Sequence, residues 1–234
     1  MTLNPEDLPL TEQVLLLALR DEKGTVESRA SMYSYALGGA ILAELVLADR
    51  VRIGQEKKPL VDAVPSTPLE DPILEECRAA IVGATRRKSA QAWVSRFAGI
   101  RKLKHRVARG LCRKGVLRDT EDQVLLLFTR KTYPTTDPGP ERHLVERMRE
   151  AIFGDGERLE PRVALLVALA HAAQMLPIHF PKKELKQRKE RLARIVGGDL
   201  IGGATLAAVR AAQSAVRAAV VTSIVISAAS HHSR

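Results

Sequence analysis

The sequence predicts a mainly α-helical protein, a single compact helical domain with a central buried helix core, surrounding amphipathic helices and one or two small β-hairpins. Composition supports this fold class. Of the 234 residues, 45% are hydrophobic and only 3% are aromatic. Leu, Ala and Val supply most of the apolar content, which favours helix packing over a β-sandwich rich in aromatic residues. A chain of this length buries about 70% of the surface that it exposes when unfolded, so residues 1–234 suffice for one domain.

The first part of the chain carries two helix signals. Residues 1–10 are expected to form a flexible N-terminal segment, and Thr11 precedes a Leu-rich helix that the polar residues 21–24 end. Residues 33–48 are almost continuously apolar, as in a helix that is buried on most sides. The acid within this segment, Glu44, is expected to pair with a cation from a neighbouring helix, because an unpaired buried charge is costly.

Two hairpins are predicted in the middle of the chain. Residues 51–64 have β-favouring ends around a polar centre, which predicts a small hairpin closed by the prolines that follow it. Helices are expected at 74–84 and 90–97. The stretch 122–132 has five consecutive apolar residues at its centre and prolines after it, which favours a strand or hairpin.

The C-terminal part is predicted to be helical. Helices are expected over residues 141–153, 161–176, 181–196 and 204–229. His171 lies in an apolar stretch of the second of these helices. This position favours a hydrogen-bonded core histidine over a ligand.

The ends of the chain predict a cytoplasmic protein. Residues 1–10 contain acids and prolines and lack the basic and then apolar pattern of a secretory leader. The apolar stretch 218–229 is shorter than the about 20 residues that cross a bilayer. Any membrane association is therefore expected to be peripheral.

No residue pattern indicates catalysis or a bound cofactor. Cys77 and Cys112 are far apart and are the two cysteines of the chain, which excludes a disulfide framework and a zinc site of cysteine pairs. The sequence lacks a Walker loop, a nucleophile elbow and a zinc-protease motif. We therefore expect a non-enzymatic protein with no metal and no cofactor.

The strongest functional signal is a run of positive charge from Arg86 to Arg118. It holds twelve Lys and Arg residues and no Asp or Glu, whereas the whole chain has a net charge of +10. Such a concentration of charge is typical of a surface that binds a polyanion. The candidates are an anionic membrane lipid and a nucleic acid, and the alternative is a solvated basic face without a ligand. The scarcity of aromatic residues argues against nucleic-acid binding by base stacking.

Helical periodicity separates this run into two faces. An apolar stripe of Ile100, Leu103, Val107 and Leu111 is expected to dock on the core. The opposite arc is cationic and is formed by Lys104, Arg101, His105, Arg109, Lys102, Arg113 and Arg106. Two small residues, Ala108 and Cys112, lie between Lys104 and Arg101 on this projection and predict a recess for a small phosphorylated head group.

Four sequence motifs occur in an order that matches a known family. They are Leu10–Asp21, Leu37–Leu45, Lys114–Leu117, and Leu169–Ala172 together with Leu176 and Phe180. In these motifs the chain resembles the Golgi phosphoprotein 3 family over nearly its whole length. The resemblance implies a cytosolic, mostly helical protein with a projecting hairpin. Eukaryotic members bind phosphatidylinositol 4-phosphate on Golgi membranes and engage the tails of resident glycosyltransferases, so anionic lipid and protein cargo are the implied partners.

The resemblance also implies a lipid head-group site. The two cations that the family places before its Lys-Gly-Val-Leu motif fall on Arg101 and Lys104, and its pocket Trp and pocket Arg fall on Arg29 and Gly38. Phosphate charge is then met by Arg101, Lys104 and Arg29, while the flat aromatic wall is missing. A supporting basic face is expected from His105, Arg109 and Lys102.

The hairpin predicted over 122–132 resembles the family's hairpin, which is implicated in oligomer contacts and membrane insertion. Its apolar centre supplies the candidate residues Leu125, Leu126, Leu127 and Phe128. The resemblance implies that these residues insert into the acyl boundary beside the basic face or join copies of the chain in a homo-oligomer. An ordinary buried strand has the same periodicity, so this alternative stays open. A protein-interaction scaffold without a lipid ligand is a further alternative.

Overall fold

The computed structural model describes residues 7–54, 59–124, 128–200, 214, 217 and 218. The fold is mainly α-helical, as the composition predicts. The helices are α1 Leu10–Ala18, the 3₁₀ helix η2 Ser28–Ala30, α2 Tyr33–Leu47, α3 Pro72–Val82, α4 Ala90–Ala98, α5 Leu103–Arg113, α6 Gly139–Phe153, α7 Pro161–Ala172, α8 Leu176–His179, α9 Lys182–Gln187 and α10 Lys189–Gly197.

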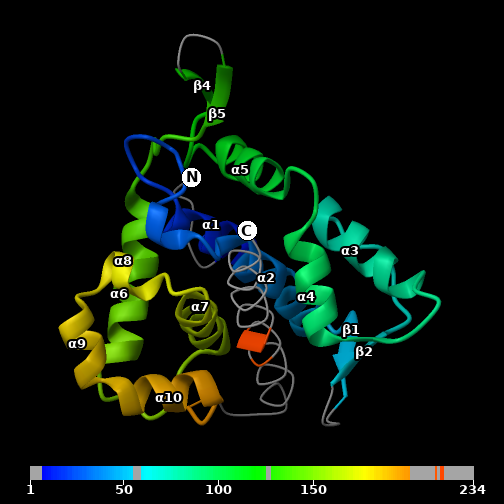
Figure 1. The fold of residues 1–234 in the computed structure, drawn as a ribbon. Helices are drawn as coiled ribbons and strands as arrows, with labels where there is room; N and C mark the ends of the chain where they lie inside the picture. Colours follow the sequence, from blue (N-terminus) through cyan, green and yellow to red (C-terminus); the bar gives the residue numbers. More distant parts are fainter. Residues whose placement is uncertain (1–6, 55–58, 125–127, 201–213, 215–216, 219–234) are drawn as a thin grey trace, which may run out of the picture.

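Two helices form the centre of the molecule. Every residue of α1 is buried, and α2 is buried from Ala36 to Leu45. Helix α2 packs against α1, α4 and α7, and α1 also packs against α5 and α6. The remaining helices surround this pair, with α3 and α4 on one side and α6 to α10 on the other (Figure 1). The predicted central buried helix is therefore confirmed.

The contact between α2 and α4 depends on a glycine. A Cβ atom at Gly38 would lie 2.4 Å from the carbonyl oxygen of Val94 and 3.0 Å from the backbone nitrogen of Ala98. Both atoms belong to the α4 backbone, which cannot give way as a flexible side chain does. Gly38 is thus the residue that lets the two helices approach this closely.

Strands form two small antiparallel sheets. The order in the first is β1 (Val51–Ile53), β2 (Leu60–Ala63) and β3 (Lys88–Ser89), so the predicted hairpin gains a short third strand. The second is a hairpin of β4 (Thr120–Val124) and β5 (Phe128–Thr132), in register from Thr120 opposite Thr132 to Val124 opposite Phe128. This hairpin projects from the helical body beside α5 (Figure 1).

Two predicted helices differ in extent from those of the structure, and a third lies mostly outside the described residues. The helix expected over 161–176 ends at Ala172, because Gln174 takes a left-handed backbone conformation with φ of 59° before α8 begins. The helix expected over 181–196 is divided at Arg188 into α9 and α10. The helix expected over 204–229 lies outside the described residues except for Ser214, Arg217 and Ala218, which are helical.

The basic helix also begins later than its periodicity suggests. Lys102 has a left-handed φ of 59°, so Arg101 and Lys102 form a turn and α5 starts at Leu103. The side chain of Arg101 therefore does not share the helical projection of Lys104.

The prediction that His171 belongs to the core was wrong. This residue lies on α7, and its side chain is exposed.

Candidate functional site

Helix α5 presents its cations because its other face is fixed to the core. Leu103, Val107 and Leu111 are each at most 4% exposed, and α5 packs on the buried helix α1. The predicted apolar stripe is confirmed for these three residues. Ala108 is fully buried, so it does not form the open recess that the helical projection predicts between Lys104 and Arg101.

The base of the β4–β5 hairpin is held beside α5 by backbone hydrogen bonds. The amide of Tyr133 donates to the carbonyl of Gly24 over 2.9 Å, and the amide of Arg118 donates to the carbonyl of Pro134 over 3.1 Å. Gly24 has φ of 57°, and a Cβ there would lie 2.1 Å from the backbone of Tyr133. The hairpin base therefore rests directly on the loop that follows α1.

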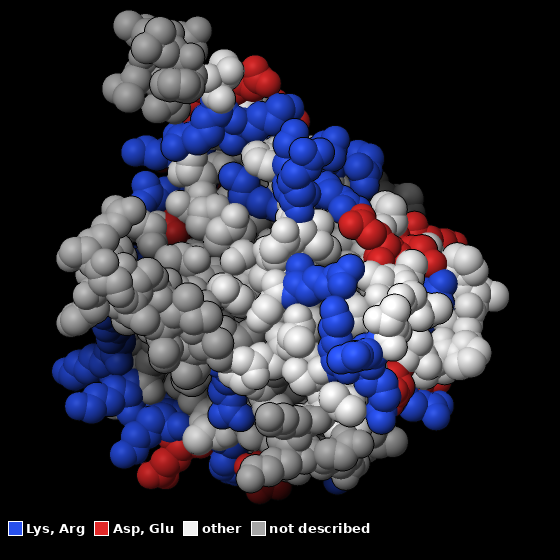
Figure 2. Space-filling view, turned by 45° about the vertical axis from the view of Figure 1, so that its right-hand side comes forward, with Lys and Arg blue, Asp and Glu red and all other residues white. Residues whose placement is uncertain are grey.

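A cleft of about 610 Å³ lies between α5 and this hairpin, and we call it the α5–hairpin cleft. The cations that line it are Lys102, Lys104 and Arg109 from α5 and its preceding turn, and Arg130 and Lys131 from β5. The space-filling view shows a band of Lys and Arg directly below the hairpin (Figure 2). The sequence identified the α5 side of this cleft but not the hairpin side.

Charge is distributed unevenly across the α5–hairpin cleft. On the hairpin, Lys131 lies 3.4 Å from Asp119 and 3.9 Å from Glu121, and Arg130 lies 3.9 Å from Asp122. Within the described part of the chain, Lys102, Lys104 and Arg109 have no carboxylate within ion-pair distance. The α5 side therefore carries the uncompensated positive charge. Burial, together with the nearby Arg130 guanidinium, lowers the pKa of Lys104.

An aromatic residue lies beneath these cations. Tyr133 is fully buried, its hydroxyl lies 2.8 Å from Nδ1 of His105, and the ammonium of Lys104 lies 6.0 Å from the centre of its ring. Burial raises the pKa of Tyr133 to about 12. Burial and the charges of Lys104 and Lys102 lower the pKa of His105. His105 is therefore neutral near pH 7 and adds a hydrogen-bonding group rather than a charge.

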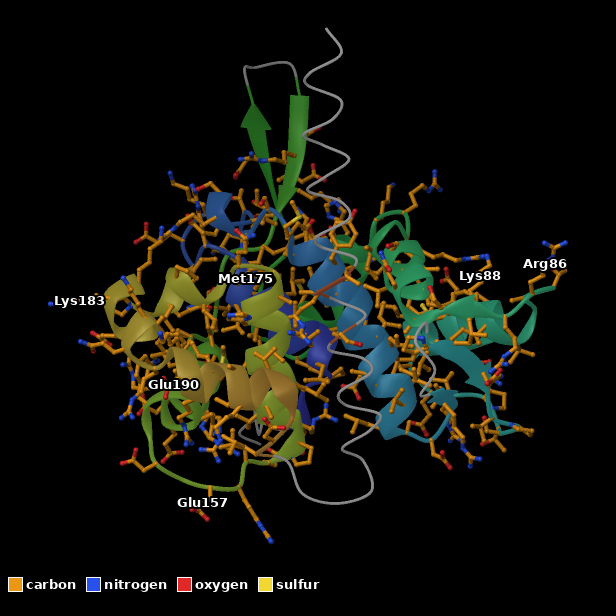
Figure 3. All side chains as sticks on the ribbon, turned by 60° about the horizontal axis from the view of Figure 1, so that its bottom comes forward. Arg86, Lys88, Glu157, Met175, Lys183 and Glu190 are labelled. Carbon is orange, nitrogen blue, oxygen red and sulfur yellow. The ribbon has the colours of Figure 1, made fainter. Side chains whose placement is uncertain are left out.

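Several other cations of the basic run are neutralised by residues that are distant in sequence. Arg87 pairs with Asp62, Arg106 lies 2.6 Å from Glu76, and Lys114 pairs with Glu12. Arg86 and Lys88 lie on the far side of the molecule from Lys183, near α3 and α4 (Figure 3). The run from Arg86 to Arg118 contains no acid, but in the fold it does not form one continuous surface of unpaired positive charge.

The structure separates the predicted head-group residues. Of Arg29, Gly38, Arg101 and Lys104, only Lys104 lines the α5–hairpin cleft. Arg101 is exposed in the turn before α5, and Gly38 is buried against α4. Arg29 donates a hydrogen bond of 3.0 Å to the carbonyl of Pro177 and lines a separate groove beside α8 and α10.

The remaining predicted site residues have different outcomes. Lys102, His105 and Arg109, the supporting basic face, all line the α5–hairpin cleft. Leu125, Leu126 and Leu127 lie outside the described residues, as does the side chain of Phe128. The role assigned to the hairpin tip therefore stays a prediction.

Arg130, Lys131 and Tyr133 are cleft residues that sequence reasoning missed. A signal for the two cations was present, because Glu121 and Asp122 precede the apolar centre of the hairpin and Arg130 and Lys131 follow it. In the antiparallel register Asp122 stands opposite Arg130 and Glu121 opposite Lys131. Opposite charges at such cross-strand positions stabilise a hairpin.

The described residues show neither a metal site nor a membrane span. They contain no group of three or more His, Cys, Asp or Glu side chains placed to hold a metal ion. None of the helices described is both long enough and apolar enough to span a membrane.

Comparison with known proteins identifies related sequences. Residues 10–220 match the family model described as Golgi phosphoprotein 3. The chain is also similar to the vacuolar protein sorting-associated protein 74 of Eremothecium gossypii, with 26% identity over 219 aligned residues. This alignment covers 80% of the present chain and 66% of the relative, so the chain spans slightly less than two thirds of that relative's length.

Proposed function

Because this chain belongs to the Golgi phosphoprotein 3 family, we propose that it is a peripheral membrane adaptor that binds phosphorylated, anionic lipid head groups in the α5–hairpin cleft. In this proposal the protein acts at a membrane surface without catalysing a reaction. The head group is phosphatidylinositol 4-phosphate or another phosphorylated lipid, and the bound protein recruits a protein cargo.

One observation carries this proposal. Lys102, Lys104 and Arg109 face a cleft of about 610 Å³ and have no carboxylate partner among the described residues. A volume of this size is within the range of about 300–1,000 Å³ that is typical of small-ligand sites. Each cation near an anionic surface contributes about 1 kcal/mol to binding. The two carboxylates that also line the cleft, those of Asp119 and Glu121, lie within ion-pair distance of Lys131, so the three cations of the α5 side remain to favour a phosphate group as the ligand.

The family resemblance suggests a second attachment at the hairpin. Strands β4 and β5 project past α5, and the sequence between them is Leu125–Leu127 (Figure 1). We propose that these residues enter the acyl boundary while the cleft holds a head group. Stable peripheral anchoring usually requires two such weak signals together.

The chemistry of the cleft favours recognition of phosphate charge over recognition of a sugar ring. The aromatic ring that lines it, that of Tyr133, is fully buried beneath Lys104. Lys102 and Lys104 provide point charges, whereas Arg109 can bind a phosphate with two parallel hydrogen bonds. We therefore expect binding to several phosphorylated lipids with modest discrimination between them.

Vesicle flotation tests this function. The protein is mixed with three kinds of vesicle: phosphatidylcholine alone, phosphatidylcholine with phosphatidylserine, and phosphatidylcholine with phosphatidylinositol 4-phosphate. Binding is expected to the two anionic compositions and to be stronger for the phosphorylated lipid. The Lys104→Ala/Arg109→Ala double variant is expected to bind at least about tenfold more weakly, because two contributions of about 1 kcal/mol are lost.

A matched control removes two charges elsewhere. Lys183 and Arg194 are exposed on α9 and α10, away from the α5–hairpin cleft. The Lys183→Ala/Arg194→Ala variant is expected to keep nearly the full affinity. Failure of the unmodified protein to bind any of the three vesicle types would reject the proposal, and equal losses in both double variants would reject the cleft as the site.

A further inference from the structure

A second hollow lies on another face of the molecule, between α8, α9, α10 and the end of α7. Its volume is about 850 Å³, and we call it the α9–α10 groove. Its apolar lining includes Leu185, Leu192 and Val196, each at most 9% exposed in the protein. Lys182, Lys186 and Lys189 line it as well and are exposed.

The order of residues on α9 and α10 creates this combination. In α9, Lys182 is followed at spacings of three and four residues by Leu185 and Lys186, and in α10 Lys189, Leu192 and Val196 are three and four residues apart, so each helix turns one face to the groove. The acids of these two helices, Glu184 and Glu190, do not line the groove. Lys183, which is also outside this face, points away from the body of the molecule (Figure 3).

The groove carries positive charge that nearby acids do not cancel. Among the described residues, no Asp or Glu lines it, and its three lysines have no carboxylate within ion-pair distance. Two further cations line it: Arg217, and Arg29, which lies 3.8 Å from Glu27. Among the described residues, the lining of this groove and that of the α5–hairpin cleft have no residue in common. It is a separate hollow.

We propose that the α9–α10 groove binds a single-chain anionic amphiphile, such as a fatty acid or a lysophosphatidate. Leu185, Leu192 and Val196 would form the apolar floor beneath the acyl chain, and the lysines at the rim would hold the carboxylate or phosphate. Removing the apolar chain from water supplies most of the affinity, because the burial of apolar surface is favourable. The unpaired lysines select an anionic head over a neutral one.

A fluorescent fatty acid tests this site. Dansylaminoundecanoic acid is titrated into the full-length protein, and its emission is expected to rise and shift to shorter wavelength as the dansyl group leaves water. Oleate and oleoyl lysophosphatidate are then added as competitors, which distinguishes a carboxylate from a phosphate head. Both are expected to displace the probe, whereas oleyl alcohol, which has no charge, is expected to compete at least about tenfold more weakly.

Two variants locate the binding. Lys186→Glu/Lys189→Glu is expected to weaken probe binding by about tenfold or more, while the charge-matched control Lys183→Glu/Arg194→Glu leaves it nearly unchanged. Ala193 is exposed and lines the groove, so Ala193→Trp is expected to block the acyl chain by bulk without changing charge. Circular dichroism checks that each variant is folded.

Three results would overturn the inference. One is the absence of a fluorescence change with the unmodified, folded protein. Another is an equal loss of binding in the two double-Glu variants, which would indicate a diffuse charge effect. The third is displacement of the probe by an acidic amphipathic peptide but by neither oleate nor oleoyl lysophosphatidate, which would assign the groove to a protein partner.

Discussion

Arg162 on α7 forms a two-pronged ion pair with Glu44 on α2. Its Nη2 atom lies 2.7 Å from Oε1 of Glu44 and its Nη1 atom lies 3.3 Å from Oε2. The backbone amide of Leu10, at the start of α1, donates to the same carboxylate over 2.6 Å. One carboxylate thus joins α1, α2 and α7, and the pairing predicted for Glu44 is confirmed.

Replacing Arg162 by Leu is expected to destabilise the protein. The variant leaves the Glu44 carboxylate, whose side chain is only 11% exposed, without its cation. We expect a loss of about 2–4 kcal/mol in the free energy of unfolding, measured by urea denaturation. Arg52→Leu is the control, because Arg52 and Asp49 are both more than 70% exposed and 3.8 Å apart. A similar loss in both variants would contradict a special role for the Glu44 pair.

Stability is expected to fall as the pH rises through the titration of Glu141, at the start of α6. Burial and the neighbouring carboxyl group of Asp21 raise the pKa of Glu141 from 4.5 to about 8. The folded state therefore binds an extra proton between these values, and this stabilisation is complete below pH 4.5 and disappears above about pH 8. The measurement is the melting temperature at about pH 6 and about pH 9.

Glu141→Gln is expected to flatten this pH dependence, because the amide keeps the shape of the protonated acid and does not ionise. Glu146, on the same helix, is 71% exposed and serves as the control when replaced by Gln. An unchanged difference between the two pH values in the Glu141→Gln variant would show that another group is responsible.

Gly38→Ala is expected to destabilise the protein by about 1–3 kcal/mol, since the added methyl group would press on the α4 backbone. Gly99 is a suitable comparison, because a Cβ there would lie 3.5 Å from its nearest neighbour. Gly99→Ala is expected to be nearly neutral. Thermal denaturation of both variants provides the measurement, and equal melting temperatures would show that α2 and α4 can separate without cost.

Vesicle binding through the α5–hairpin cleft is expected to weaken strongly with salt. Raising the ionic strength from about 0.1 M to about 1 M shortens the screening length from about 10 Å to about 3 Å, which reduces attraction between exposed charges. Flotation at both concentrations measures the effect. Binding that does not change with salt would indicate that insertion of apolar residues, rather than the cations of α5, dominates.

Periodicity and composition were sufficient to predict most of the architecture. The buried helix at 33–48, the docked face of α5 and both hairpins follow from patterns that repeat every two or 3.6 residues. Breaks caused by a single backbone angle were not predictable in this way. Lys102 and Gln174 both have φ of 59°, a conformation that Lys and Gln seldom adopt. No sequence pattern predicts it at these positions.

The candidate site was predictable only on the side that one helix contributes. Lys104, His105 and Arg109 are close in sequence, so a helical projection brings them together. The pairing of Lys114 with Glu12, or of Arg106 with Glu76, joins residues of different elements, and neither pair has a local signature. A ligand meets only the cations that stay unpaired after such ion pairs have formed. Which cations these are depends on the complete fold.

The close contact at Gly38 has an evolutionary consequence. The family resemblance assigns a pocket arginine to this position, yet no side chain fits between α2 and α4 here without displacing backbone atoms of Val94 or Ala98. A Gly38→Arg substitution therefore cannot be accommodated while the two helices stay in place. A relative with a side chain at this position needs a wider separation of α2 and α4, whereas exposed positions of α5 and β5 can accept a further cation without moving a helix.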